Sequence, residues 1–169
     1  MDDVRWLIAR EIPYLRRCAR ALVGDPDAAD DLVQDAVERA LRKRHLWRGT
    51  GNLRSWLYRL LYNVLVNRRD RPKVDRHQVP LDDTPEPIAP GRPDKTVEAG
   101  DLAAALRALP VEQRAAIVLT GLQGLSYDEA AHALDIPVGT LRSRIARGRE
   151  QLRTATEYPD RRKQIRRVK

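Results

Sequence analysis

A group of basic and hydroxyl side chains near the C-terminal end has the chemistry needed to bind DNA. Val138, Leu141, Ile145 and Leu152 recur at helical spacing, which predicts one buried helix face. The opposite face carries Thr140, Arg142, Ser143, Arg144, Arg147 and Arg149. Guanidinium groups bond phosphates and guanines through a fork of donors, and the major groove of DNA admits such a helix. The alternative is a basic helix that only faces solvent on a small bundle.

The residues before this helix predict a shorter helix and a tight turn. Ser126 and Glu129 have the spacing of a capping box, in which each side chain bonds the other residue's backbone N–H. Ala130 and Ala131 supply small apolar positions that let another helix cross closely. Pro137 disfavours a helical conformation in the residue before it and suits a helix start. This arrangement predicts a helix-turn-helix and favours DNA binding over simple exposure.

A second polar group belongs to residues 47–67. The glycine-bearing loop 47–52 precedes a helix expected from Leu53 to about Arg69, with Tyr58 and Tyr62 on its polar side. The candidate side chains are Trp47, Arg48, Thr50, Asn52, Arg59, Asn63 and Asn67. Arginine, asparagine and aromatic side chains beside such a loop are the groups that hold unstacked bases. Trp56 is more simply explained as a core residue, whereas Trp47 fits either role.

Acidic side chains mark the helix that follows Asp25 and Pro26. Its apolar stripe runs from Ala29 to Ala40, and its exposed face carries Asp31, Gln34, Asp35 and Glu38. Acidic residues early in a helix stabilise it through the helix dipole, which is one explanation. Asp35 and Glu38 lie too far along the helix for that effect. We therefore expect this acidic face to bind a protein partner.

These groups fall on two predicted helical units, so we expect an all-α fold. Residues 1–71 form the first unit, and residues 101–157 form the unit with the helix-turn-helix. Residues 72–100 are rich in proline and poor in large apolar side chains, which predicts an extended linker. Residues 158–169 form a basic tail.

Proline and leucine positions set two further expectations. Pro13 is expected to open the first helix, which Gly24 ends. Leu102, Leu106 and Leu109 are expected to form a buried face in the second unit.

The composition indicates a polyanionic partner inside the cell. The formal net charge is +8, although a GC-rich genome would also favour arginine. The single cysteine, Cys18, excludes an internal disulfide and is expected in the core. No signal peptide or membrane-spanning stretch is recognisable, so we expect a soluble cytoplasmic protein.

The sequence predicts no catalytic centre. Its three histidines lack metal-ligand spacing, and no nucleophile–base arrangement or paired carboxylates stand out. No phosphate-binding loop of the GxxxxGK[ST] type is present. We therefore expect a protein that is not an enzyme and that uses no cofactor, metal or small-molecule substrate.

In chain order, several motifs resemble those of bacterial RNA polymerase sigma factors of the sigma-70 family. They are Asp30-Asp31-Leu32-Val33-Gln34-Asp35, Trp47-Arg48-Gly49, Ser55-Trp56-Leu57-Tyr58-Arg59 with Asn63, and the stretch from Leu125 to Arg149. With two units and a short linker, the chain is similar to the extracytoplasmic-function (ECF) group, which keeps regions 2 and 4. The resemblance implies a transcription initiation factor that recruits core RNA polymerase to promoters and helps to open the DNA. It also implies an anti-sigma factor that restrains the protein until a signal, such as stress, arrives.

The resemblance implies a role for each polar group. The acidic face corresponds to the surface for the β′ clamp helices of the polymerase, and the β flap is a further part of core polymerase that the resemblance implies as a partner. The loop residues from Arg48 to Asn52 correspond to the capture of a flipped minus-ten base, and Arg59, Asn63 and Asn67 to the upstream edge of the opened strand. The arginine helix corresponds to the reader of the minus-thirty-five element of promoter DNA. Trp47 replaces the usual phenylalanine, and Ala146 replaces a larger residue whose groove contact is not expected here.

Two other classes of protein stay open. A sigma mimic would occupy an anti-sigma factor without touching promoters, and lost basicity in the recognition helix or an attached receiver domain would indicate it. The arginines are present here. A small recombinase would need a nucleophile, and Ser55 beside Trp56 is a poor candidate.

Overall fold

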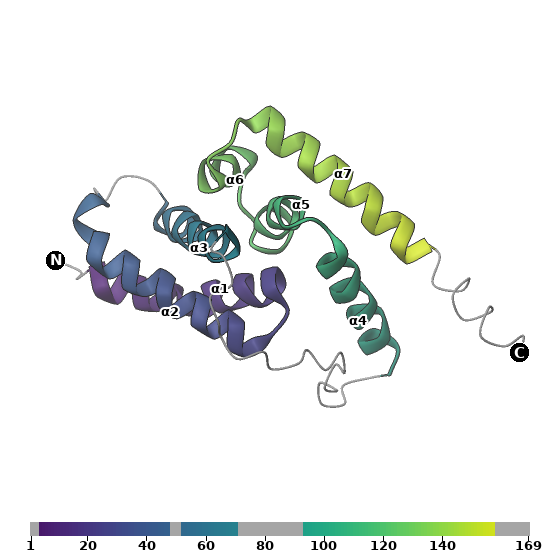
Figure 1. Ribbon diagram of the computed structural model, residues 1–169, viewed down its shortest axis with the longest axis horizontal. Helices are drawn as coiled ribbons and strands as arrows, with labels where there is room; N and C mark the ends of the chain where they lie inside the picture. The colour runs from purple at the N-terminus through teal and green to yellow at the C-terminus, as the bar shows by residue number, and fades with distance from the viewer. Residues whose placement is uncertain (1–3, 48–51, 71–92, 158–169) are drawn as a thin grey trace, which may run out of the picture.

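The computed structural model describes residues 4–47, 52–70 and 93–157, and every regular element within these ranges is a helix (Figure 1). The expected all-α class is therefore confirmed. Arg48, Thr50, residues 72–92 of the predicted linker and the tail 158–169 lie outside the described residues. None of the described helices is both long enough and apolar enough to cross a bilayer.

Helix α1 (Val4–Val23) contains Pro13 in its interior, so the prediction that Pro13 opens the helix was wrong. The residues before the proline provide the physical reason. Ile8 is 1% exposed and Ile12 packs against the core, so tertiary burial sustains a helix that proline disfavours locally. Gly24 ends α1 with φ 82°, as predicted. Leu15, Cys18, Ala19 and Leu22 are buried as expected.

Helices α2 (Pro26–Lys43) and α3 (Leu53–Asp70) complete the N-terminal half, with the 3-10 turn η1 (Arg44–Leu46) between them. The carboxylate of Asp25 caps α2 by accepting the N–H of Ala28 at 2.7 Å. Helix α1 packs along α2, and α3 packs on both of them. This bundle buries one face of α3 and leaves another face for other contacts.

Within residues 93–157, the C-terminal half contains five helical segments. They are α4 (Pro93–Ala108), α5 (Val111–Ile117), the π-helical turn η2 (Val118–Leu122), α6 (Tyr127–Leu134) and α7 (Val138–Glu157). Helix α4 begins inside the segment predicted to be an extended linker, and proline suits this first helical position. Leu109 is 4% exposed as predicted, whereas Leu102 is 46% exposed and lies outside the core.

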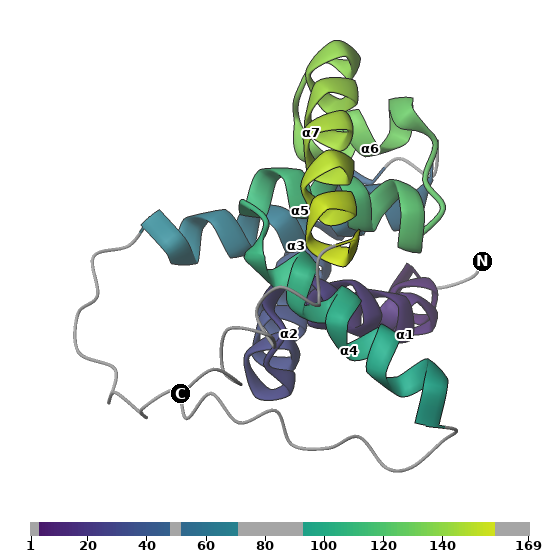
Figure 2. The same cartoon turned by 90° about the vertical axis from the view of Figure 1, so that its right-hand side faces the viewer.

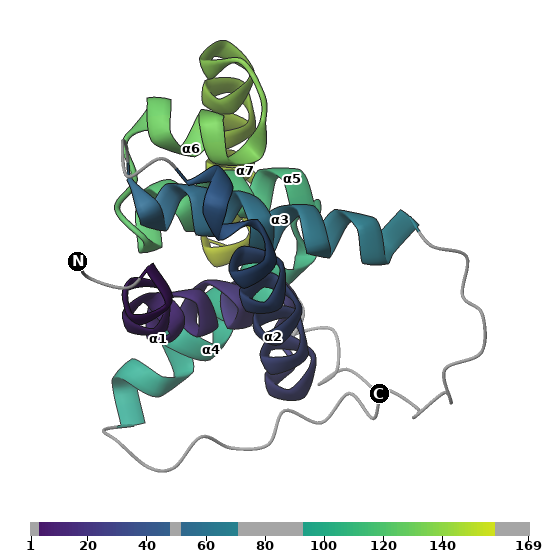
Figure 3. The ribbon, with the colours of Figure 1, turned by 90° about the vertical axis from the view of Figure 1, so that its left-hand side faces the viewer.

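The two halves pack against each other through one continuous apolar cluster. Helix α3 contacts α6, and α1 contacts α4, α5 and η2. Figures 2 and 3 show α1 beside α4. Arg114 of α5 donates hydrogen bonds to the carbonyl of Leu22 in α1 and to the carbonyls of Arg107 and Leu109 at 2.7 and 2.8 Å. A core of about 70 residues is only marginally stable by itself, so each half gains burial from the other.

Candidate nucleic-acid interface

The predicted helix-turn-helix is present as α6 and α7. The N–H of Glu129 donates to Oγ of Ser126 at 3.2 Å, and the N–H of Ser126 donates to Oε2 of Glu129 at 2.9 Å. Both bonds of the capping box therefore form. Asp135 ends α6 in the left-handed conformation with φ 56°, which aspartate tolerates better than most residues. This geometry keeps the turn short, and α7 starts at Val138.

Close packing against α5 fixes the orientation of α7. Leu141 and Ile145 are 0% and 3% exposed, as the helical spacing predicted. Gly148 lies so close to α5 that a Cβ there would be 2.5 Å from Cδ1 of Ile117 and 3.4 Å from Cβ of Gln113. Buried contacts therefore fix the rotation of α7 about its axis, through Leu141 in an early turn and Gly148 in a later turn.

The polar side of α7 carries all six candidate residues predicted from the sequence, and we call it the arginine face. Arg142, Ser143, Arg147 and Arg149 are exposed, whereas Thr140 and Arg144 are half-buried. The Ser143 hydroxyl donates to the Thr140 carbonyl at 2.9 Å. Most of these guanidinium groups therefore face outward, where they could contact phosphate or base edges.

Four candidates of the first half lie along α3 and at its start, and we call them the α3 polar stripe: Asn52, Arg59, Asn63 and Asn67. Arg59, Asn63 and Asn67 are spaced four residues apart and so share one helix face. Asn63 and Asn67 are exposed. Asn52 is exposed too and caps α3, because its Oδ1 accepts the N–H of Arg54 at 3.0 Å.

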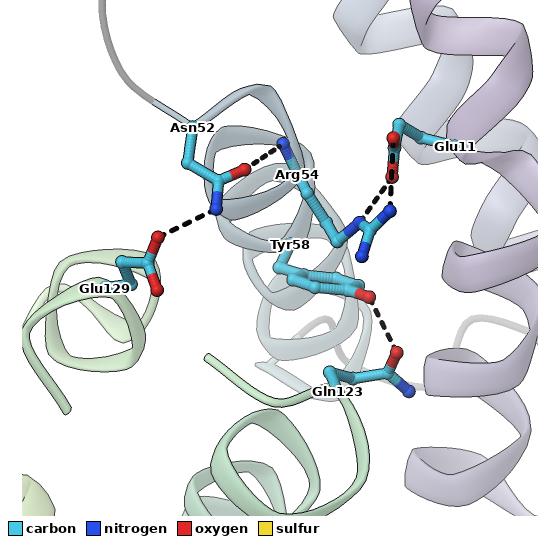
Figure 4. A network of polar contacts seen from close by, with 6 residues as sticks. All are labelled: Glu11, Asn52, Arg54, Tyr58, Gln123 and Glu129. Atoms are coloured by element: carbon cyan, nitrogen blue, oxygen red, sulfur yellow. Dashed lines mark hydrogen bonds and ion pairs between the residues drawn. The ribbon is translucent and has the colours of Figure 1, made fainter. Parts of the chain in front are cut away.

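Two members of the α3 polar stripe contact the helix-turn-helix. Nδ2 of Asn52 donates to Oε1 of Glu129 at 2.7 Å (Figure 4). Arg59 forms an ion pair with Asp135, with 3.2 Å between nitrogen and oxygen. The pKa of Glu129 is lowered, first by the hydrogen bond from Asn52 and then by those from Ser126. The structure thus joins two predicted DNA-contacting side chains to carboxylates of the other half.

The loop candidates are only partly described. Trp47 is half-buried and follows η1, where its N–H donates to the Arg44 carbonyl at 3.2 Å. Trp56 is partly buried against the apolar cluster. Arg48 and Thr50 lie outside the described residues, so their predicted role stays a prediction.

Tyr58 and Tyr62 are buried, so the prediction that they lie on the polar side of α3 was wrong. Local spacing missed them because the C-terminal half covers this side of the helix. Tyr58 is 1% exposed, and its hydroxyl donates to Oε1 of Gln123 at 2.7 Å. Burial raises the pKa of Tyr58 and of Tyr62, and the nearby Arg144 opposes the rise at Tyr62.

A charged contact that was not predicted from the sequence orients the start of α3. Nε of Arg54 lies 2.5 Å from the carboxylate of Glu11, and the guanidinium stacks 3.7 Å from the centre of the Tyr14 ring. The hydrogen bond that Arg54 donates to Glu11 raises the pKa of the Arg54 guanidinium. Figure 4 shows Arg54 between Glu11 and the Tyr58 side chain. No local pattern in the sequence links these helices, so only the packing of α1 on α3 reveals the contact.

The predicted acidic face lies on α2, with Asp31, Gln34 and Glu38 exposed and Asp35 half-buried. Nε2 of Gln34 donates to Oε1 of Glu38 at 3.3 Å, and Glu38 lies 3.4 Å from Arg42. Such exposed contacts contribute little to stability, so these side chains remain available to a partner. Among the described residues, no group of three or more His, Cys, Asp or Glu side chains could hold a metal ion.

Comparisons with known families match both halves. Residues 8–62 match the family model described as the Sigma2 domain of PhyR, and residues 99–152 match the model for Sigma-70, region 4. The ECF RNA polymerase sigma factor EcfG of Rhodopseudomonas palustris is 37% identical over 161 residues, which cover 94% of this chain and 87% of the relative.

Two further comparisons extend over most of the chain. The ECF RNA polymerase sigma factor SigM of Mycobacterium tuberculosis (strain H37Rv) is 36% identical over 155 residues, covering 90% of this chain and 76% of the relative. The co-crystal structure of the sigma factor RpoE with the anti-sigma factor NepR from Bartonella quintana matches with a TM-score of 0.73 and 29% identity. The match covers 94% of this chain and 99% of that one.

Proposed function

The chain belongs to the ECF group of RNA polymerase sigma factors, and we propose that it binds core polymerase, directs it to specific promoters and promotes strand opening. The observation that carries this proposal is the arginine face on α7, presented outward by a capped helix-turn-helix in the half that matches region 4. A helix in this setting reads base edges while its neighbours hold phosphates. The arginine face is thus assigned to the minus-thirty-five element.

The α3 polar stripe is assigned to the minus-ten element. Amides of asparagine can bond base edges, and arginine can hold the phosphate backbone of an opened strand. Trp47, together with the loop residues Arg48 and Thr50, completes this proposed surface. Strand opening then draws on binding energy, since extruding a base costs a few kcal/mol that contacts to the open strand offset.

Two protein partners follow from the family. The acidic face of α2 is the proposed surface for the β′ clamp helices, and the C-terminal half is the proposed contact for the β flap. An anti-sigma factor is the proposed inhibitor, in line with the RpoE–NepR complex that this chain resembles.

A run-off transcription assay tests the proposal. Purified core polymerase and this protein are incubated with fragments of genomic DNA, and transcripts that need the added protein are sequenced. We expect a set of start sites that share two upstream elements. A variant with Arg142, Arg144, Arg147 and Arg149 changed to alanine serves as the control and should lose those transcripts. Transcription that stays at the level of core polymerase alone would contradict the proposal.

A sigma mimic is the second candidate, because the family model that matches residues 8–62 is that of the Sigma2 domain of PhyR, and PhyR of Bartonella quintana is an anti-anti-sigma factor. Such a protein would bind an anti-sigma factor yet leave promoters and core polymerase unbound. Co-purification with core polymerase separates the two functions. Retention of core polymerase supports the sigma factor, whereas retention of an anti-sigma factor alone supports the mimic.

A further inference from the structure

Both carboxylates that engage the α3 polar stripe belong to the ends of α6. Glu129 lies in its first turn and accepts from Asn52 at 2.7 Å, while Asp135 ends the helix and pairs with Arg59. The spacing of the two acids along α6 therefore matches the spacing of two donors along α3. Donors of the same kind would bond base acceptors and phosphate oxygens in an opened strand.

Buried side chains lie beside these polar contacts and also join α3 to the C-terminal half. Ser55 is 5% exposed and its hydroxyl donates to the backbone carbonyl of Glu129 at 3.1 Å. The buried Tyr58 hydroxyl reaches Gln123 just beyond η2, as Figure 4 shows. Hydrogen bonds from such buried side chains hold one specific arrangement of the two halves, because a broken bond would leave buried polar groups unpaired.

The arginine face is also engaged at the same boundary. Arg144 is half-buried and lies near the Tyr62 hydroxyl of α3, where it opposes the rise in the pKa of Tyr62. Arg69 at the end of α3 pairs with Glu112 of α5 at 3.2 Å. One arrangement of the halves therefore restrains side chains assigned to both promoter elements.

We propose that Glu129 and Asp135 form an internal latch that imitates nucleic acid: they occupy Asn52 and Arg59 in the free protein, so that opened promoter DNA must displace them. This inference rests on the proposed function of the α3 polar stripe. The latch and the DNA compete for the same donors, so the closed arrangement inhibits the protein's own DNA binding. The apparent affinity for single-stranded DNA equals the affinity of the open form multiplied by the fraction of molecules in which the latch is open.

Two substitutions weaken the latch while retaining the local fold. Glu129→Gln removes the charge but keeps a residue that completes a capping box. Asp135→Asn removes the second charge and keeps a side chain that tolerates the left-handed conformation. A matched control, Asp30→Asn with Asp101→Asn, also removes two carboxylates, from exposed positions on α2 and α4.

The first measurement needs no DNA. Small-angle X-ray scattering of the full chain gives the radius of gyration, and circular dichroism checks that helix content is unchanged. We expect the double latch variant to be more expanded than the wild type and the control. Equal radii in all three proteins would overturn the latch whether or not the chain is a sigma factor.

The second measurement uses a fluorescein-labelled 12-nucleotide single strand of random sequence in an anisotropy titration. The double latch variant should bind about tenfold more tightly than the wild type, while the control should change less than twofold. Expansion without a gain in binding would show that the acids hold the halves together but do not imitate DNA, which overturns the proposal. The latch variant could show both the expansion and the tighter binding while the protein supports no run-off transcription. That combination would refute only the proposed function.

Discussion

Arg68 of α3 and Asp35 of α2 form an ion pair with 2.6 Å between nitrogen and oxygen, and the same guanidinium donates to the carbonyl of Asp31 at 3.0 Å. Asp35 therefore stabilises the packing of α2 on α3 as well as contributing to the acidic face. A variant at Asp35 would mix a structural effect with an effect on a partner. Asp31 and Glu38, whose side chains are exposed, are cleaner probes of that face.

Asp31→Arg combined with Glu38→Arg should weaken binding to core polymerase by about tenfold or more. Charges at the rim of an interface mainly set the association rate and its dependence on salt. Surface plasmon resonance at two salt concentrations measures both effects. Asp101→Arg on α4 is the control and should bind as the wild type does. Unchanged association of the double variant would remove the acidic face from the polymerase interface.

The arginine face should divide into residues that read sequence and residues that hold phosphate. Alanine at a base-reading arginine should cost about 1–3 kcal/mol of discrimination between the cognate and a scrambled upstream element. Alanine at a phosphate contact should weaken binding to both DNAs equally. It should also reduce the slope of log affinity against log salt concentration by about one. Mobility-shift titrations of variants at Arg142, Arg144, Arg147 and Arg149 separate the two types. Equal losses on both DNAs in all four variants would mean that α7 reads no sequence.

Asn63→Ala should leave closed promoter complexes intact and suppress open ones. Its side chain is exposed, so the substitution should leave unfolding stability nearly unchanged. Asn52→Ala should also reduce opening, but it removes the cap of α3 and should cost about 1 kcal/mol of stability. Permanganate reactivity of unpaired thymines reports opening, and a mobility shift reports the closed complex. Normal reactivity in the Asn63 variant would exclude this amide from the opening step.

The carboxylate of Glu129 should titrate below the ordinary value of 4.5 because Asn52, and then Ser126, donate hydrogen bonds to it. The pKa of Glu129 is lower in the folded protein than in the unfolded chain. The stabilisation by these hydrogen bonds is therefore complete above the pKa of the unfolded chain and is lost as the pH falls through the pKa of the folded protein. Nuclear magnetic resonance of the side-chain carboxyl carbon follows the titration. Asn52→Ala should raise the midpoint partway, whereas Asn63→Ala should leave it in place. A Glu129 midpoint that is the same in the wild type and in the Asn52→Ala variant would contradict the contact between Asn52 and Glu129 in solution.

Gly148→Leu should destabilise the protein by about 1–3 kcal/mol, because a side chain there collides with Ile117 and Gln113 of α5. Gly139→Ala in the same helix is the control, since a Cβ at Gly139 meets nothing within 4 Å. That substitution should be neutral or stabilise by up to about 1 kcal/mol. Urea unfolding measures both variants, and equal midpoints for Gly148→Leu and the wild type would refute the close approach of α5 and α7.

Features governed by neighbours in the sequence were predictable. The capping box at Ser126, the cap at Asp25 and the end of α1 at Gly24 each depend on residues within one turn. The stripe through Leu141 and Ile145 followed from helical spacing alone. Local rules therefore gave the helix-turn-helix and the positions of the arginine face.

Features governed by contact between the halves were not predictable from one sequence. The spacing of Tyr58 and Tyr62 on α3 indicates a polar side, and only the presence of the C-terminal half explains their burial. The prediction that Pro13 opens α1 was wrong for a similar reason. Burial of Ile8 stabilises helical turns before the proline, although proline locally indicates a helix start. The contacts of Asn52 and Arg59 with α6 join residues that are far apart in the sequence, 77 positions for Asn52 and Glu129. No spacing rule links such residues.

Helix α6 contacts both α7 and α3. Ala130, Ala131 and Ala133 of α6 are fully or almost fully buried, and their small side chains let neighbouring helices approach closely. A short helix shared in this way is a point of thermodynamic linkage. Any ligand that prefers α6 separated from α3 makes every other ligand with that preference bind more tightly, by the same factor in each direction. Polymerase and promoter DNA would then bind this chain cooperatively without touching each other.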